Sequence, residues 1–325
     1  MHAPMLTVSV STSNERSRVF IIWFLSRRDW AIHLHKPTFD QHPALTSLKR
    51  PGMSFSKIMS FLAVLTRDFE VSRAVSNAVW TDHALVRATS WVRLMWLAAE
   101  RPVTGVVLDA ELVPGDVGLE AAVEEFTVRF PSLWLVLVAR SGTDPWGLFR
   151  LGRAGLRNLV LTHLDELHSG VARAIRIGFG LSTEALVTRA VSPHLPASET
   201  LAVRLALRGA QLGWTTGELA ARAGVTRAHL SVRLKARGLP SAGHLLVWAK
   251  LLHAGRWLGD PGRTGESVSR QLEYSSGAAF RRALRNYTGS TPMGIREAGG
   301  LKPVLDAFLG TCGFGRDQPS TLFVA

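Results

Sequence analysis

The chain has 325 residues, and its 38 Lys and Arg against 25 Asp and Glu give a formal net charge of +13. Its single cysteine, Cys312, excludes intrachain disulfides and cysteine-based zinc sites and suits a reducing cytoplasm. The positive charge is concentrated in residues 207–299, which hold 14 Lys and Arg against 5 Asp and Glu, whereas residues 58–178 hold 12 against 13. We therefore expect the C-terminal part to bind a polyanion.

Residues 1–57 do not resemble part of a folded domain. Their longest apolar run, Val19–Leu25, has seven residues, well below the ~20 needed to span a bilayer. It follows a segment that contains Glu15, and no clear small-residue cleavage site comes after it, which argues against a secretory signal. We expect an N-terminal extension that is poorly ordered or that reflects an overlong start assignment.

Residues 58–178 alternate short apolar runs with amphipathic stretches. This alternation predicts parallel strands covered by helices, and five strands in this length indicate a flavodoxin-like α/β domain. The predicted strands are Phe61–Leu65, Ala84–Ala88, Gly105–Leu108, Leu133–Val138 and Leu159–Leu161. The predicted helices between them are Glu70–Val79, Trp91–Glu100, Leu119–Phe130 and Pro145–Gly155.

The third predicted strand ends in Val106-Val107-Leu108-Asp109, and Ser141 follows the fourth strand. With Pro114, Gly115, Gly118 and Gly155, these positions resemble a response-regulator receiver domain. The resemblance implies that Asp109 stands at the phosphoacceptor position and Ser141 at the hydroxyl position.

Other parts of a phosphoaccepting site are missing from the sequence. The first strand ends in Thr66-Arg67 with only Asp68 after it, and Leu161-Thr162-His163 offers no lysine at the end of the fifth strand. A magnesium site there would be short of negative charge. We predict a pseudo-receiver in which Asp109 is structural and the domain serves dimerisation or partner binding. The alternative is a working response regulator that is phosphorylated on Asp109.

After a helical linker over 179–206, which continues to about Gly209, two helix-turn-helix patterns lie about 50 residues apart. In the first, Thr215 and Glu218 fit a capping box, Gly224 fits a left-handed turn, and Thr226 fits the cap of a second helix. Leu230 and Leu234 would point inward from that helix. Ser241 can cap a connecting helix that ends near Leu258. The second pattern runs from Val268 through Tyr274 to Phe280, Leu284 and Arg285.

Residues 207–299 resemble the DNA-binding domain of the AraC/XylS transcription regulators, including the closing run from Gly289 through Thr291-Pro292 to Arg296. The resemblance implies recognition helices at 227–236 and 277–286, set in two adjacent major-groove segments. The base-facing positions that it implies are Ala228, Ser231, Val232, Gly277, Ala278, Arg281 and Arg282. We expect Arg227, Lys235 and Arg285 to hold phosphates.

The second unit departs from the family pattern at Gly265, Ser269 and Glu273. An internal glycine costs ~1 kcal/mol relative to alanine, and a glutamate where the backbone is left-handed adds strain. Val232 stands where many members of the family carry arginine, so it can touch a thymine methyl but cannot read guanine. These departures predict a narrower or weaker DNA site.

The sequence thus predicts an α/β domain followed by an all-helical domain, in a cytoplasmic, sequence-specific transcription regulator. Residues 300–325 form a tail with one short helix at Pro303–Leu309. We expect double-stranded DNA as partner, a homodimer through the receiver-like domain, contact with RNA polymerase, and no membrane. No catalytic grouping, metal site or cofactor is expected. A protein-interaction module with a decayed second helix-turn-helix is the remaining alternative.

Overall fold

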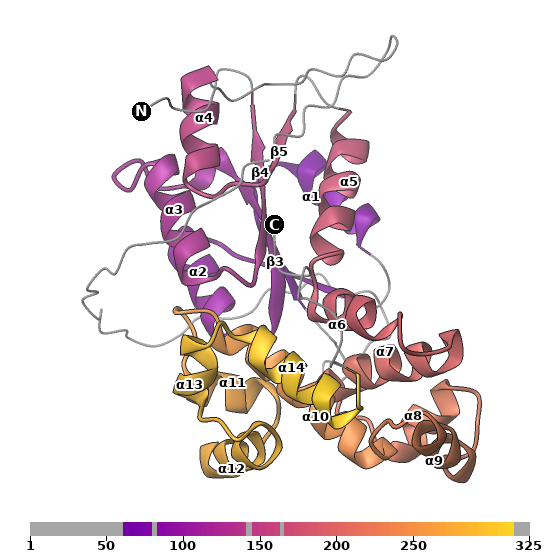
Figure 1. Ribbon diagram of the computed structural model, residues 1–325. Helices are drawn as coiled ribbons and strands as arrows, with labels where there is room; N and C mark the ends of the chain where they lie inside the picture. Colours follow the sequence, from indigo (N-terminus) through magenta and orange to yellow (C-terminus); the bar gives the residue numbers. More distant parts are fainter. Residues whose placement is uncertain (1–60, 80–82, 141–144, 163–165, 315–325) are drawn as a thin grey trace, which may run out of the picture.

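The computed structural model describes residues 61–79, 83–140, 145–162 and 166–314, so the predictions for 1–57, Ser141 and His163 lie outside the described residues. Figure 1 shows an α/β part above a helical part. The strands are β1 (Phe61–Leu65), β2 (Ala84–Arg87), β3 (Val103–Asp109), β4 (Trp134–Ala139) and β5 (Asn158–Leu161). The helices of this part are α1 (Phe69–Ala78), α2 (Trp91–Glu100), η2 (Ala110–Leu112), α3 (Leu119–Arg129), α4 (Pro145–Arg153) and α5 (Leu167–Phe179).

The five strands form one parallel sheet in the order β2-β1-β3-β4-β5. Helices α1 and α5 cover one face, and α2, α3 and α4 cover the other (Figure 1). Both faces are therefore buried, and this explains why β4 is an unbroken apolar run with every residue buried. The predicted flavodoxin-like architecture is confirmed, with strand ends shifted by one or two residues.

The helical part contains nine helices within the described residues. They are α6 (Thr183–Val191), α7 (Ala197–Gln211), α8 (Thr216–Arg222), α9 (Arg227–Ala236), α10 (Ala242–Leu258), α11 (Gly265–Gln271), α12 (Gly277–Thr288), α13 (Pro292–Glu297) and α14 (Leu301–Thr311).

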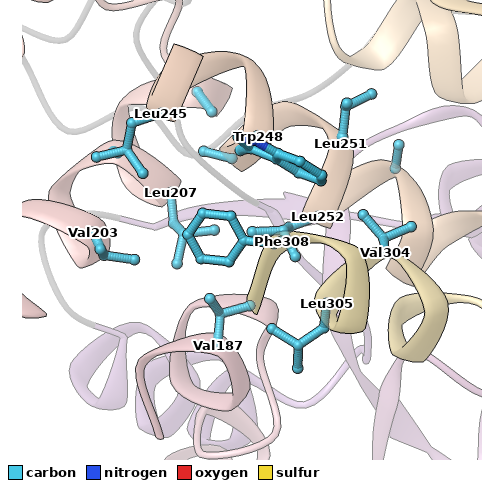
Figure 2. Packing of buried hydrophobic residues seen from close by; sticks show 14 of the residues in the cluster. Val187, Val203, Leu207, Leu245, Trp248, Leu251, Leu252, Val304, Leu305 and Phe308 are labelled. Carbon is cyan, nitrogen blue, oxygen red and sulfur yellow. The ribbon is translucent and has the colours of Figure 1, made fainter. Parts of the chain in front are cut away.

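Helix α10 runs through the core of this part and is packed on several sides. Figure 2 shows Trp248 of α10 among Val203 and Leu207 of α7 and Phe308 of α14, and the rings of Trp248 and Phe308 lie 5.5 Å apart. Val187 of α6 belongs to the same cluster. The linker and tail segments therefore supply core residues, which the sequence analysis did not anticipate.

A buried ion pair joins the two parts at the end of α10. The Arg263 guanidinium lies 3.0 Å from the Asp260 carboxylate, and both side chains are 0% exposed. Asp260 also accepts hydrogen bonds from the Ser132 amide (2.8 Å) and hydroxyl (2.5 Å) at the start of β4. Arg263 donates to the carbonyls of Arg101 (3.0 Å) and Val103 (3.3 Å) at the start of β3. Helix α10 is thereby tied to the amino-terminal edge of the sheet.

Helix α11 extends this interface along α2. The Ser267 hydroxyl (3.2 Å) and the Gln271 amide (3.1 Å) both donate to the Ala99 carbonyl. Arg270 pairs with Glu100 at 2.6 Å. The first helix of the second helix-turn-helix pattern thus contacts the α/β part directly.

A buried histidine joins α7 to α10. The His253 Nε2 lies 3.0 Å from the Leu207 carbonyl, and its Nδ1 lies 3.0 Å from the Gln211 amide. These partners suit a neutral ring whose Nε2–H donates to the carbonyl and whose Nδ1 accepts from the amide. Burial lowers the pKa of His253 to about 4.

This histidine predicts an acid-sensitive core. The pKa of His253 in the folded protein is about 4, below the ordinary 6.5. Between pH 6.5 and pH 4 the unfolded chain therefore binds more protons than the folded protein, and the stability of the folded protein falls as pH falls through that window. We expect a loss of up to about 3 kcal/mol of unfolding free energy from His253 alone. Denaturant unfolding of wild type and His253→Gln across this range measures it. The exposed His229→Gln variant should keep the wild-type slope, and an unchanged slope in His253→Gln would refute the prediction.

Candidate nucleic-acid interface

The first helix-turn-helix pair, α8 and α9, begins and turns at the predicted residues. Thr215 and Glu218 form a reciprocal capping box, with the Thr215 amide 2.8 Å from the Glu218 carboxylate and the Glu218 amide 3.2 Å from the Thr215 hydroxyl. Gly224 has a φ of 70°, the left-handed conformation that ends α8. The Thr226 hydroxyl then accepts from the His229 amide at 3.2 Å and caps α9. The two caps and the left-handed glycine therefore fix where α8 begins and ends and where α9 begins.

Helix α9 has an apolar inner side and a polar outer side. Leu230 and Leu234 are buried in the helical core, which confirms the predicted inward pair. Val232 is 67% exposed, an unusual position for a large apolar side chain. The other predicted contact residues of this helix are also exposed: Arg227, Ala228, Ser231 and Lys235.

An ion pair that the sequence analysis missed anchors α9 to α7. The Nε and Nη2 atoms of Arg233 lie 3.1 and 3.0 Å from one oxygen of Glu199. Burial acts to raise the pKa of Glu199, but hydrogen bonds from Ser198 and Arg233 outweigh it and leave that pKa below its ordinary value. Glu199 therefore stays ionised at neutral pH and fixes the orientation of α9.

The second pair, α11 and α12, has the same design with one strained residue. The Thr264 hydroxyl caps α11 and the Ser276 hydroxyl caps α12, at 3.0 Å and 3.1 Å from the amides they accept. Glu273 takes the place of Gly224 in the turn, and its φ of 55° makes it the one non-glycine residue with positive φ in the described chain. Such a conformation costs roughly 1–2 kcal/mol, as the sequence analysis expected.

The predicted free-energy cost of Gly265 as a glycine inside a helix is wrong. Gly265 is the first residue of α11, directly after the cap Thr264. It is therefore not internal, and its cost is smaller because a helix end tolerates glycine better than a helix interior.

Helix α12 also divides into a buried and an exposed side. Phe280 and Leu284 are buried, and Phe280 packs against Tyr274 with ring centroids 5.3 Å apart. Gly277 is half-buried, and a side chain there would meet the Glu266 carboxylate. The remaining predicted contact residues are exposed: Ala278, Arg281, Arg282 and Arg285.

The connecting helix α10 has 17 residues, which corresponds to about 26 Å. Ser241 is the N-cap residue of α10, as predicted, but its side chain makes no capping hydrogen bond. The prediction of a side-chain cap by Ser241 is therefore wrong. Figure 1 shows α9 and α12 at the lower end of the molecule, away from the sheet.

Four residues of the closing signature have structural roles. Gly289 ends α12 with a φ of 71°, and the Thr291 hydroxyl caps α13 from 3.1 Å, with Pro292 in the first turn. Arg296 donates to the carbonyls of Leu258 (2.9 Å) and Arg263 (2.5 Å). The signature thus stabilises the joint between α10 and α11.

Asp109 lies at the carboxyl end of β3 and is only 7% exposed. Its carboxylate accepts from the Thr66 hydroxyl at 3.1 Å and from the Glu111 amide at 3.2 Å. Arg140, which the sequence analysis missed, lies 3.2 Å from Asp68 and 3.5 Å from Glu111. A guanidinium therefore pairs with the acidic groups beside Asp109.

Besides its ion pair with Arg140, Asp68 caps α1, because its carboxylate accepts hydrogen bonds from the Glu70 and Val71 amides. In the part of the chain that the structure describes, no three His, Cys, Asp or Glu side chains come together as a metal site. No helix in that part is long and apolar enough to cross a bilayer.

Residues 219–298 match the family model of a helix-turn-helix domain. No curated protein matches the chain. Among solved structures, a pilus assembly-related protein from Burkholderia pseudomallei is 18% identical, with 38% of this chain and 92% of that chain covered and a TM-score of 0.31. RcsB from Salmonella enterica serovar Typhimurium, solved bound to a promoter, is 13% identical, with coverage of 57% and 97% and a TM-score of 0.29. The response regulator StyR is 17% identical, with coverage of 58% and 96% and a TM-score of 0.30.

Proposed function

We propose that this chain is a sequence-specific, DNA-binding transcription regulator of the AraC type. In this proposal α9 and α12 enter two adjacent major-groove segments of one duplex, with α10 as the rigid spacer between them. The observation that carries the proposal is that α9 and α12, which Figure 1 places at one end of the molecule, each have an exposed side and are anchored by buried leucine or phenylalanine.

The exposed residues of these helices suit different roles. Arg281 and Arg282 can each donate two hydrogen bonds to a guanine. Ser231 can donate to or accept from a base edge, and Val232 can contact a thymine methyl. Arg227, Lys235 and Arg285 suit phosphates, which position the protein without selecting sequence. Ala228, Gly277 and Ala278 are small and let the helix backbones approach the base edges.

The test selects bound duplexes from a random pool and measures affinity for the selected site by gel shift. We expect sharp bands that survive excess nonspecific competitor, and an affinity that falls with salt by a slope of roughly −0.9 per neutralised phosphate. Lys235→Ala and Arg285→Ala should each make that slope shallower by about one unit. If only Lys235→Ala does so, α12 does not bind DNA, and the proposal that both helices bind one duplex is wrong. If no sequence is enriched, the interaction-module alternative is favoured.

We further propose that the receiver-like domain acts without phosphorylation. The carboxylate of Asp109 is already engaged by Thr66 and Glu111, and Arg140 supplies the positive charge that a metal ion would otherwise bring to its neighbours. The domain is then free to serve as a dimerisation surface or as a contact for RNA polymerase.

Phosphodonor treatment distinguishes this proposal from a phosphorylation-dependent regulator. After incubation with acetyl phosphate and magnesium, we expect the intact mass of the protein to stay unchanged, because the acidic groups beside Asp109 are paired with Arg140. Asp109→Asn should bind the selected DNA as the wild type does. A gain of one phosphoryl group in wild type that is absent from Asp109→Asn would overturn the proposal.

A further inference from the structure

A cavity of about 600 Å³ opens where the α/β part meets the helical part. Its walls come from α1 and α5 on one side and from α6 and α7 on the other. Figure 1 shows the end of α5 directly above α6 and α7. The volume falls within the range of about 300–1,000 Å³ that is typical of small-molecule sites.

One side of this cavity is apolar. Ala172, Ile175 and Phe179 line it from successive turns of α5, and Ala78 adds to it from α1. Phe179 is held in place by the Trp134 ring, with centroids 5.4 Å apart and an edge-to-face orientation. This side is therefore a preformed surface for an apolar molecular body.

The other side carries an excess of positive charge. Arg189, Arg204 and Arg208 line it, and Arg176 adds a fourth guanidinium from α5, while Glu184 is the one acid among the lining residues. Glu184 lies 3.8 Å from Arg204 and 3.5 Å from Arg208. Across the described ranges, Arg176 and Arg189 form no ion pair. The lining therefore holds four guanidinium groups against one carboxylate, and this net positive charge favours the entry of an anion.

Thr188 adds an uncommitted polar group to the same wall. Its hydroxyl is buried and has no hydrogen-bond partner among the described residues, although Thr188 lines the cavity. A buried hydroxyl without a partner costs free energy. A ligand that carries a hydrogen-bonding head group would remove that cost.

We propose that this cavity binds a small organic acid, with its carboxylate among the arginines and its apolar body against Ile175 and Phe179. An inorganic anion would leave the apolar side uncovered, and a neutral ligand would leave the arginine excess unbalanced. The site is separate from the exposed faces of α9 and α12, so it serves a ligand other than DNA. A molecule bound there would contact both parts of the protein at once.

Isothermal titration of the full chain with 2-naphthoate, in the absence of DNA, tests the proposal. We expect saturable binding with a dissociation constant of about 1 mM or tighter. The matched neutral probe 2-naphthamide should bind at least about tenfold more weakly, because it lacks the charge that the arginines recognise. Inorganic phosphate should compete poorly.

Variants locate the binding. Arg176→Gln and Arg189→Gln should each weaken 2-naphthoate binding by about 3- to 10-fold, and Thr188→Val should weaken it less. Arg173→Gln, on the exposed side of α5 and outside the cavity, is the matched control and should bind as the wild type does. Circular dichroism melts check that each variant is folded.

Three results would each overturn the proposal: no saturable 2-naphthoate binding, equal binding of 2-naphthamide, or full affinity in the Arg176→Gln/Arg189→Gln double variant. Because no DNA is present in the titration, these results leave the DNA-binding proposal untouched.

Discussion

Replacing Asp260 by asparagine is expected to lower the free energy of unfolding by about 3–5 kcal/mol, because it leaves a buried guanidinium without its counter-charge. Asp260 and Arg263 are both fully buried, 3.0 Å apart. The carboxylate also accepts two hydrogen bonds from Ser132. An asparagine amide cannot accept at every one of these positions, so at least one donor would face another donor.

The same change should separate the two parts of the protein. We expect wild type to melt in one transition and Asp260→Asn to melt in two, because the ion pair connects the end of α10 to the starts of β3 and β4. Differential scanning calorimetry measures both effects. Asp306→Asn is the matched control: its exposed pair with Lys302 should contribute less than about 1 kcal/mol. Equal stability of the two variants would show that the buried pair does not join the parts.

Replacing Arg281 or Arg282 by alanine is expected to weaken binding to the selected DNA site by about 10- to 100-fold, which corresponds to one lost bidentate contact with guanine. Both side chains are exposed on α12, whereas Phe280 beside them anchors the helix to the core. The loss should appear only with the selected sequence. Binding to random duplex DNA should change by no more than one phosphate contact would explain.

Two controls make this measurement specific. Arg285→Ala should weaken selected and random DNA alike and should make the salt dependence shallower. Arg150→Ala removes the same charge from α4, in the α/β part, and should change neither affinity. If Arg281→Ala and Arg282→Ala weaken selected and random DNA by the same factor, these arginines contact phosphates and other residues read the sequence.

Much of the fold could be predicted because its signals are local. The capping box of Thr215 and Glu218 and the turn at Gly224 each involve residues within one helical turn. The alternation of apolar runs with amphipathic stretches likewise predicted all five strands, since a sheet buried on both faces needs continuous apolar strands. The division of α9 and α12 into buried and exposed sides follows from the spacing of Leu230, Leu234, Phe280 and Leu284 along a helix.

Other predictions failed where the local pattern left the outcome open. Ser241 stands at a helix start with a side chain that could cap, yet that side chain makes no capping hydrogen bond. Gly265 is the first residue of α11 and not an internal one; sequence patterns place helix ends only to within a few residues.

The sequence by itself determined where helices and strands begin, turn and present their apolar sides, because those features depend on neighbours within a few residues. Only the tertiary structure decided how the two parts join, since Asp260 meets Ser132 from 128 positions away and no local pattern encodes that docking. The pairing of Arg233 with Glu199 and the cavity between α5 and α6 arose in the same way. Each depends on two surfaces whose relative placement is set by packing, which a periodicity along one chain segment does not contain.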